Sequence, residues 1–439
     1  MRWFGHDLFP QHQAPRRHRT RSAALVIIDV MYGEDWDPVT RTVVGPIGPR
    51  AAAARDAAGA PYAVILRAPG RPQPVAVLHI AWAHRPAGYL GIWAYDDQGR
   101  RTREIDIRRL RPDRLFLRRL AQWRYGSPEL PEFAGTAGRV RIDLHPDGTS
   151  RRVSEPRGDA GPARHTVVRV PGDRSWEPVP AFGEWGPVAA TMTGDRTAAV
   201  ELRTVPDPQG SPGVRSWHPP RPMRPRHLAE MFTVDTRFTP PPGDRADRYA
   251  VRRVIDAGLL RLPSGCLIAC DPYDGNSSDA PAVFLRPGGY RVEIAVAAYP
   301  VKLPGHWRPV EEYAAARVVV SQNPTAYWEP ATGPGQDVRL LRDGEFHGFA
   351  VGSGTGCFAD ASAERLLSGK WASDVPHEQD GITVRRDPVN GAGLIAFPSG
   401  RGDGSYPLWV GRDARGDITC VVADMLILHR AEIVPCDSC

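Results

Sequence analysis

Residues 289–297 read Gly-Tyr-Arg-Val-Glu-Ile-Ala-Val-Ala, with Tyr290, Val292, Ile294 and Val296 at every second position. Side chains alternate between the two faces of a strand, so this spacing predicts a half-buried β-strand. The chain around it contains 44 Gly and 45 Pro. So many turn formers favour short strands and frequent turns over long helices.

The first half of the chain shows two further strand-turn-strand patterns. The turn at 96–99 separates the segments 89–95 and 102–107, and the turn at 145–148 separates the segments 139–144 and 150–153. Both patterns predict β-hairpins. Two short helices are also expected. Pro112 precedes Asp113–Tyr125, where apolar residues recur at helical spacing, and Asp360–Leu367 follows a glycine-rich turn.

The composition places the chain among globular proteins. Of its 439 residues, 41% are hydrophobic and 24% are charged, which excludes a mainly disordered chain, a coiled coil or a membrane bundle. We therefore predict a β-rich α+β protein with two domains of mainly antiparallel or mixed sheet and few short helices. No stretch approaches the roughly 18 apolar residues of a membrane span.

A proline-rich segment divides the chain. The predicted organisation is a flexible basic arm (1–22), a β-rich N-terminal domain (23–204), a proline-rich linker (205–245) and a C-terminal domain (246–439). Residues 1–240 hold 36 Arg and 25 acids, a net charge of +11, whereas residues 241–439 hold 20 basic residues and 25 acids, a net charge of −5. Opposite charges favour separate partners for the two domains.

The cysteines indicate a reducing compartment. All six lie between Cys266 and Cys439, which is sparse for a secreted disulfide scaffold. The apolar run 23–28 is short and no cleavage site follows it, so a signal peptide is not expected. We predict a cytoplasmic protein.

The C-terminal half resembles the bacterial family DUF4241, a domain of unknown function, over roughly residues 245–430. The resemblance rests on motifs in a fixed order, and it implies a bacterial, cytosolic domain without an established activity. The motifs are GLLRLPSG (258–265) followed by Asp271-Pro272, GYRV (289–292), DGEF (343–346), GTGCFAD (354–360), SGRGDGSYP (399–407) and the strand that ends at Asp424.

Two candidate sites fall within these motifs. The turn containing Gly354 and Gly356 could present backbone N–H groups to an anion, although a tight structural turn with Asp360 as a helix cap is the favoured alternative. Polar residues at strand ends and turns form the second candidate, a binding or catalytic constellation. In its catalytic version Cys357 is a nucleophile with His347 and Asp403, whereas the simpler alternative is a buried structural thiol. The binding residues proposed here are Asp271, Gly354, Gly356, Asp360 and Tyr406.

We predict no cofactor, and structural zinc is the minority alternative. Cys436 and Cys439 have zinc-knuckle spacing, and Cys266 and Cys270 would share one face of a strand. Calcium binding by the acidic loop 271–279 is also considered, but the loop lacks the spacing of an EF-hand and suits a solvated turn.

An arginine-rich stretch is the remaining candidate. Residues 100–124 hold ten Arg and three acids, and Arg108, Arg109, Arg118 and Arg119 lie near aromatic residues. Such a cluster could bind a nucleic acid or an acidic protein, or its stems could cover apolar surface. No nucleic-acid-binding module surrounds it, so nucleic acid is disfavoured as a partner.

Without a complete catalytic motif, the sequence favours a non-catalytic binding protein that recognises a protein or peptide partner, as immunity or effector-associated proteins do. Its 12 Trp could supply anchoring side chains. The alternatives are a thiol-dependent or hydrolytic enzyme with its site near Cys357 and Asp403, and a polyanion-binding protein that uses residues 100–125.

Overall fold

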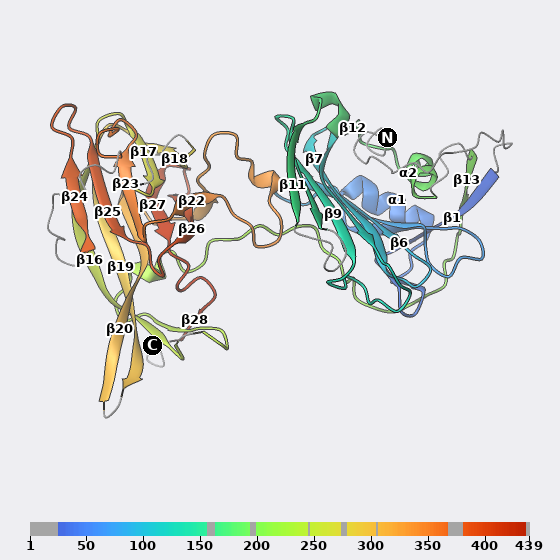
Figure 1. The fold of residues 1–439 in the computed structure, drawn as a ribbon, viewed down its shortest axis with the longest axis horizontal. Helices are drawn as coiled ribbons and strands as arrows, with labels where there is room; N and C mark the ends of the chain where they lie inside the picture. The colour runs from blue at the N-terminus through green and yellow to red at the C-terminus, as the bar shows by residue number, and fades with distance from the viewer. Residues whose placement is uncertain are drawn as a thin grey trace. The chain divides into compact units, whose positions relative to one another are not determined.

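A computed structural model describes residues 25–155, 163–193, 199–244, 246–273, 279–303, 306–367 and 381–435. The chain divides into two compact units on either side of the Pro220–Arg221 bond, and each unit is described by itself (Figure 1). Within the described residues the fold is β-rich and mostly antiparallel, with two α-helices, which confirms the predicted fold class. None of the helices in these ranges is long and apolar enough to cross a membrane.

Unit 1 contains short helices beside a large sheet. Its helices are α1 (Pro49–Ala58), α2 (Gly186–Met192) and the 3₁₀ helix η2 (Gly172–Ser175). Its strands are β1 (Leu25–Gly33), β2 (Asp35–Asp37), β3 (Thr42–Val44), β4 (Tyr62–Arg67), β5 (Ala76–Ala81), β6 (Gly88–Tyr95), β7 (Arg101–Arg111), β8 (Arg114–Arg124), β9 (Gly138–Leu144), β10 (Thr149–Glu155), β11 (Arg164–Arg169), β12 (Trp176–Pro178), β13 (Ala199–Thr204) and β14 (Gly210–Ser211).

Eleven strands of unit 1 form one sheet in the order β11-β10-β9-β8-β7-β6-β5-β4-β1-β13, with β12 paired to β8. Most neighbours in this sheet are also neighbours in sequence, and every pair is antiparallel except β1 with β13. Both predicted hairpins are confirmed, as β6–β7 and β9–β10. Because the strands follow one another in order, β11 lies at one end of the sheet and β13 at the other (Figure 1).

The helix predicted over Asp113–Tyr125 was wrong, because this segment is strand β8. Pro112 and Asp113 connect β7 to β8, with Arg111 paired to Arg114, so the proline introduces a hairpin turn and not a helix. Both faces of β8 are buried from Leu115 to Ala121. A strand covered on both faces has no polar alternation, and its apolar residues then match a helical spacing by chance.

The described residues of unit 2 form two packed sheets and two 3₁₀ helices, η3 (Glu230–Phe232) and η4 (Val338–Leu340). Its strands are β15 (Arg237–Thr239), β16 (Tyr249–Leu262), β17 (Cys266–Cys270), β18 (Ala282–Phe284), β19 (Gly288–Leu303), β20 (His306–Val319), β21 (Tyr327–Pro330), β22 (Gly348–Val351), β23 (Thr355–Asp360), β24 (Thr383–Arg386), β25 (Gly393–Pro398), β26 (Gly404–Arg412), β27 (Ile418–Asp424) and β28 (Glu432–Ile433).

The larger sheet of unit 2 has nine strands in the order β21-β26-β27-β20-β19-β16-β15-β28, with β22 paired to β26, and the smaller has the order β18-β17-β23-β25-β24. Both sheets contribute to one apolar core, in which Ile294 and Val421 of the larger contact the same cluster as Phe358 and Phe397 of the smaller. The predicted strand at 289–297 is confirmed as part of β19. A second, smaller core on the opposite face of β17 and β23 includes Cys270 and Cys357.

The helix predicted at Asp360–Leu367 was also wrong, because residues 361–367 form turns after β23. The Asp360 carboxylate accepts hydrogen bonds from the backbone N–H of Ser264 on a distant turn and of Ser362. These bonds fold the chain back at the strand end. Leu366 and Leu367 then pack into the smaller core without a helix.

Candidate functional site

The glycine-rich turn, for which a structural role was favoured over an anion site, joins two strands, β22 and β23. Gly354 has a φ of 70°, a conformation that favours glycine. The backbone N–H groups of Gly352 and Ser353 each donate to Asp271 Oδ2 at 2.9 Å, and Ser353 Oγ donates to Asp271 Oδ1 at 2.9 Å. The turn therefore does bind an anion, and that anion is the protein's own Asp271 carboxylate.

The other polar residues singled out in the family motifs also bind neighbouring turns. Asp360 is fully buried and accepts from Ser264 Oγ at 2.7 Å as well as from the backbone. Tyr406 donates to the carbonyls of Ser399 at 2.7 Å and Gly402 at 2.6 Å, and burial raises the pKa of its hydroxyl. These contacts hold the motifs together as a folded unit.

Cys357 lies opposite Cys270 on the neighbouring strand, with 3.6 Å between the two Sγ atoms. Burial raises the pKa of the Cys357 thiol well above its usual value, and the hydrogen bond with Cys270 raises it further. Among the described residues its hydrogen-bond contact is with Cys270 and not with His347, whose buried Nε2 has no partner there. Asp403 is exposed on the turn before β26. The structure thus brings Cys357 to a second thiol.

The cysteines proposed for zinc are only partly described. Cys266 and Cys270 both contact the smaller core of unit 2. Cys436 and Cys439 lie outside the described residues, as do Asp274 and Asn276 of the acidic loop. Within the ranges that the structure covers, no group of three or more His, Cys, Asp or Glu side chains could hold a metal ion.

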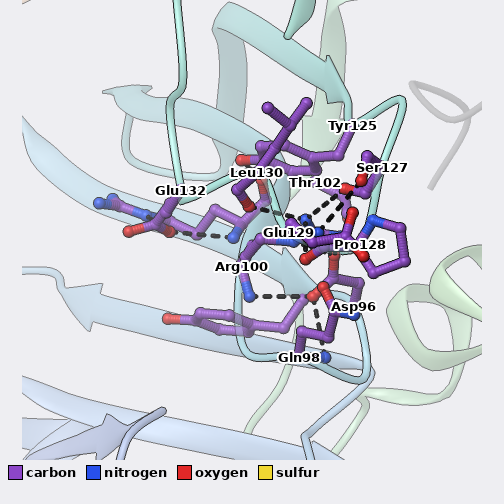
Figure 2. Close-up of polar contacts among 12 residues, drawn as sticks. Asp96, Gln98, Arg100, Thr102, Tyr125, Ser127, Pro128, Glu129, Leu130 and Glu132 are labelled. Carbon is purple, nitrogen blue, oxygen red and sulfur yellow. Dashed lines mark hydrogen bonds and ion pairs between the residues drawn. The ribbon is translucent and has the colours of Figure 1, made fainter.

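The arginines of the stretch 100–124 bind other parts of unit 1. Figure 2 shows Arg100 between Asp96 and the loop after β8, where its Nη1 donates to the carbonyls of Ser127 at 3.0 Å and Leu130 at 2.8 Å. Its guanidinium also lies 4.3 Å from the ring centroid of Tyr125. Arg100 therefore fixes this loop, because one planar group satisfies several acceptors.

The four arginines proposed for nucleic-acid binding are similarly engaged. Arg108 is fully buried and donates to Asp106 at 2.6 and 2.9 Å. Arg118 and Arg119 are each 8% exposed, and both pair with Asp143. Arg109 donates to the carbonyl of Pro112. Three of the four, Arg108, Arg118 and Arg119, are thus buried against acids of the same sheet.

A buried polar cluster in unit 1 has no signal in the sequence, because its members are far apart along the chain. His79 Nε2 lies 3.1 Å from Asp35 Oδ1, and Ser216 Oγ donates to Asp35 Oδ2 at 2.5 Å. Burial lowers the pKa of His79. Burial alone would raise the pKa of Asp35, but the bonds from His79 and Ser216 lower it. Since Ser216 bonds the carboxylate and not the imidazole, this is not a nucleophile-base pair. It holds the segment around Trp217 on the sheet.

Strand β11 is the most exposed strand of the main sheet in unit 1. All six of its residues are exposed, and Val167 and Val168 are 75% and 51% exposed. No strand within the described ranges pairs with its outer edge. Exposed apolar residues on an unpaired edge are unusual, because such edges invite pairing with another chain.

The register of β11 shows which backbone groups are free to pair. Val168 lies opposite Ser150 of β10, and just beyond the strand the N–H of Val170 donates to the carbonyl of Gly148 at 2.8 Å. In an antiparallel pair, residues two apart direct their N–H and C=O groups to the same side. Even-numbered residues therefore bond β10. The residues whose N–H and C=O groups point away from the sheet are His165, Val167 and Arg169.

The surface around this edge is basic. The described residues from 138 to 169 include six Arg and three acids. Two of these arginines, Arg139 and Arg141, pair with acids of the same strands. Arg151, Arg164 and Arg169 make no direct ion pair with a described acid, and Arg151 contacts the His165 ring instead, at 3.3 Å. The edge thus combines free backbone groups, exposed valines and excess positive charge.

The fold and this edge define a β-rich two-unit protein with a basic edge strand, β11, whose outer edge pairs with no described strand. Residues 260–423 match the model of the family DUF4241, a protein family of unknown function, which confirms the resemblance for the C-terminal part of the chain. Strand β11 lies outside the matched residues. No curated protein and no solved structure matches the chain.

Proposed function

We propose that this protein is a non-catalytic binding protein that recognises an extended, acidic segment of a partner protein by strand addition to β11. The observation that supports this most directly is the outward direction of the N–H and C=O groups of His165, Val167 and Arg169 on a sheet edge without a described neighbour. A peptide laid along such an edge continues the hydrogen-bond ladder of the sheet.

The expected affinity comes from the backbone and the two valines together. Each added backbone bond contributes about 0.5–1.5 kcal/mol net. Val167 and Val168 point to opposite faces of the strand, so alternate side chains of the peptide can cover each of them. Cross-strand apolar pairs of this kind add roughly 0.2–1 kcal/mol each. The sum suits a moderate, reversible complex, since association itself costs several kcal/mol.

The positive charge around β11 favours an acidic peptide as the binding partner. An acidic peptide would face Arg164, Arg169 and Arg151, which favours its approach and its register. A second copy of this chain is disfavoured. Antiparallel pairing of two β11 strands would bring the basic end at Arg169 against the basic end at Arg164 of the other copy, and like charges opposite each other destabilise a sheet.

We place this interaction in the bacterial cytoplasm. The support is the family resemblance of residues 260–423 and the state of Cys266, Cys270, Cys357 and Cys420, all of which are free thiols. Six cysteines in 439 residues are sparse for a secreted disulfide scaffold, which favours a reducing compartment. The proposed binding uses only backbone and side-chain groups and needs no cofactor.

The test is fluorescence anisotropy with a labelled hexapeptide of alternating glutamate and valine, and with its lysine counterpart. Val167→Pro removes an outward N–H but no bond to β10, so it should weaken binding of the acidic peptide at least about fivefold. The matched control Val167→Thr keeps the N–H and should stay within about twofold. The lysine peptide should bind far more weakly than the glutamate peptide.

A charge exchange keeps the proposal testable if the proline variant misfolds. Arg164→Glu combined with Arg169→Glu changes exposed side chains only and should reverse the preference toward the lysine peptide. Equal binding of both peptides to the native chain, or an unchanged preference in the exchanged variant, would overturn the proposal.

A further inference from the structure

A cleft of about 560 Å³ lies on the nine-stranded sheet of unit 2, where β15, β16 and β19 are neighbours. Its volume falls in the range of about 300–1,000 Å³ that is usual for small-molecule sites. Strand β15 and the chain end beside it lie outside the residues that match the DUF4241 family. The cleft is therefore a feature of this chain that the family match does not describe.

Two arginines stand at diagonal positions of the cleft. Arg237 of β15 pairs with Ala250 of β16, and the same register continued by two residues places Thr239 beside Arg248. Paired residues and residues two apart share one face of a sheet. The arginines therefore occupy two corners of a square, with diagonal backbones about 7–8 Å apart, and small side chains occupy the other two. Both guanidinium groups can reach one ligand that lies over this square.

The floor of the cleft continues from the arginines onto β19. Ala250 pairs with Ala298, and Pro300 follows two residues later on the same face. Ala298 and Pro300 are half-buried. They lie one strand away from β16, a spacing of about 4.8 Å. A ligand of a single ring's length can thus contact the arginines and this apolar floor together.

The charge of the lining is positive. Arg237 and Arg248 are exposed, and their side chains make no hydrogen bond or ion pair with any residue that the structure describes. No acid is among the described residues that line the cleft. Two acids stand on the same face outside it: Glu311, which Arg253 binds at 2.8 Å, and Glu432 of β28.

Two unpaired guanidinium groups suit a dianion. A phosphate monoester carries a charge of about −1.5 to −2 at pH 7, whereas a carboxylate carries a single charge. The planar N–H donors of arginine match the oxygens of a phosphate group, and the hydroxyl of Thr239 offers a further donor at the same square. The apolar floor favours a ligand with an organic part over the free anion.

We propose that this cleft binds a small phosphate monoester, with its phosphate between Arg237 and Arg248 and its organic part over Ala298 and Pro300. The site is independent of the peptide-binding edge in unit 1, and neither proposal requires the other.

Isothermal titration calorimetry of the full chain tests the ligand class with phenyl phosphate, inorganic phosphate, benzoate and phenol. Phenyl phosphate should bind best. Inorganic phosphate should bind at least about threefold more weakly because it lacks the ring, and benzoate at least about fivefold more weakly because it is a monoanion. Phenol should not bind. Equal affinity for benzoate and phenyl phosphate would overturn the assignment to phosphate.

Substitutions of the arginines locate the binding. Arg237→Gln and Arg248→Gln should each lower the affinity for phenyl phosphate at least about fivefold, because each removes a charge-assisted contact. Both side chains are exposed, so neither replacement threatens the fold. Arg253→Gln is the matched control, since Arg253 lies on the same face, pairs with Glu311 and does not line the cleft. Its affinity should stay within about twofold of the native value.

Two further variants separate the parts of the proposal. Ala298→Leu fills the floor, so it should remove the advantage of phenyl phosphate over inorganic phosphate without weakening inorganic phosphate. The exchange Arg164→Glu with Arg169→Glu changes only β11 and should leave phenyl phosphate binding unchanged. No binding of phenyl phosphate up to about 5 mM, native affinity in both the Arg237 and Arg248 variants, or loss of binding in the β11 exchange would overturn the proposal.

Discussion

Replacing Asp271 with alanine removes the anion that fills the glycine-rich turn between β22 and β23. The carboxylate is 6% exposed and accepts bonds from the backbone N–H groups of Tyr273, Gly352 and Ser353 and from Ser353 Oγ. A hydrogen bond to a charged group contributes about 1.5–3 kcal/mol. The four are not additive, and water can reach part of the turn. We therefore expect a loss of about 3–4 kcal/mol in the free energy of unfolding of unit 2.

The assay is hydrogen exchange with mass spectrometry over a urea series, because it reports the stability of the two units separately. Asp403→Ala is the control, since Asp403 is an exposed aspartate beside a comparable glycine-rich turn, and its replacement should change stability by less than about 0.5 kcal/mol. Formate should restore part of the stability of Asp271→Ala by binding the vacated N–H groups, and should not affect the native chain. Equal, small losses in both variants would refute the reasoning.

Three further results are expected. Burial lowers the pKa of His79, so as the pH falls below the ordinary histidine pKa of about 6.5 the imidazole is protonated in the unfolded chain before it is protonated in the folded one. Unit 1 should therefore lose stability as the pH falls from 7.5 to 5.5. In urea titrations, His79→Gln should reduce this dependence of stability on pH. Arg108→Met should cost about 3–5 kcal/mol by leaving Asp106 buried and unpaired, and Asp106→Leu in the same chain should recover most of that loss in the same titrations. Peptide mapping after iodoacetamide treatment should show Cys357 modified only as fast as unit 2 unfolds, and earlier modification would contradict its burial.

Features set by local sequence could be predicted. The alternation at 289–297 and the glycine turns at 96–99 and 145–148 each depend on neighbours along the chain, and the structure has strands and hairpins there. The segment 113–125 failed because burial on both faces of β8 depends on Asp143 and on the strands that cover it. The spacing of its apolar residues therefore gave a false indication of a helix.

The candidate sites depend on contacts between distant residues. Asp271 and Gly352 were separate features of the sequence, and nothing local indicates that they meet across 81 positions. The same holds for Asp35 and Ser216, which are 181 positions apart. The sequence could not show that β11 is an edge strand, because its place at the end of the sheet depends on how all the strands of unit 1 are ordered.

The most direct test of the peptide-binding proposal is amide hydrogen exchange, resolved to single residues of β11, with and without the acidic hexapeptide. The account predicts slower exchange at His165, Val167 and Arg169, whose N–H groups point away from the sheet, and unchanged exchange at Thr166 and Val168, which already bond β10. Exchange at His165, Val167 and Arg169 that stays the same when the peptide is added would contradict strand addition at this edge.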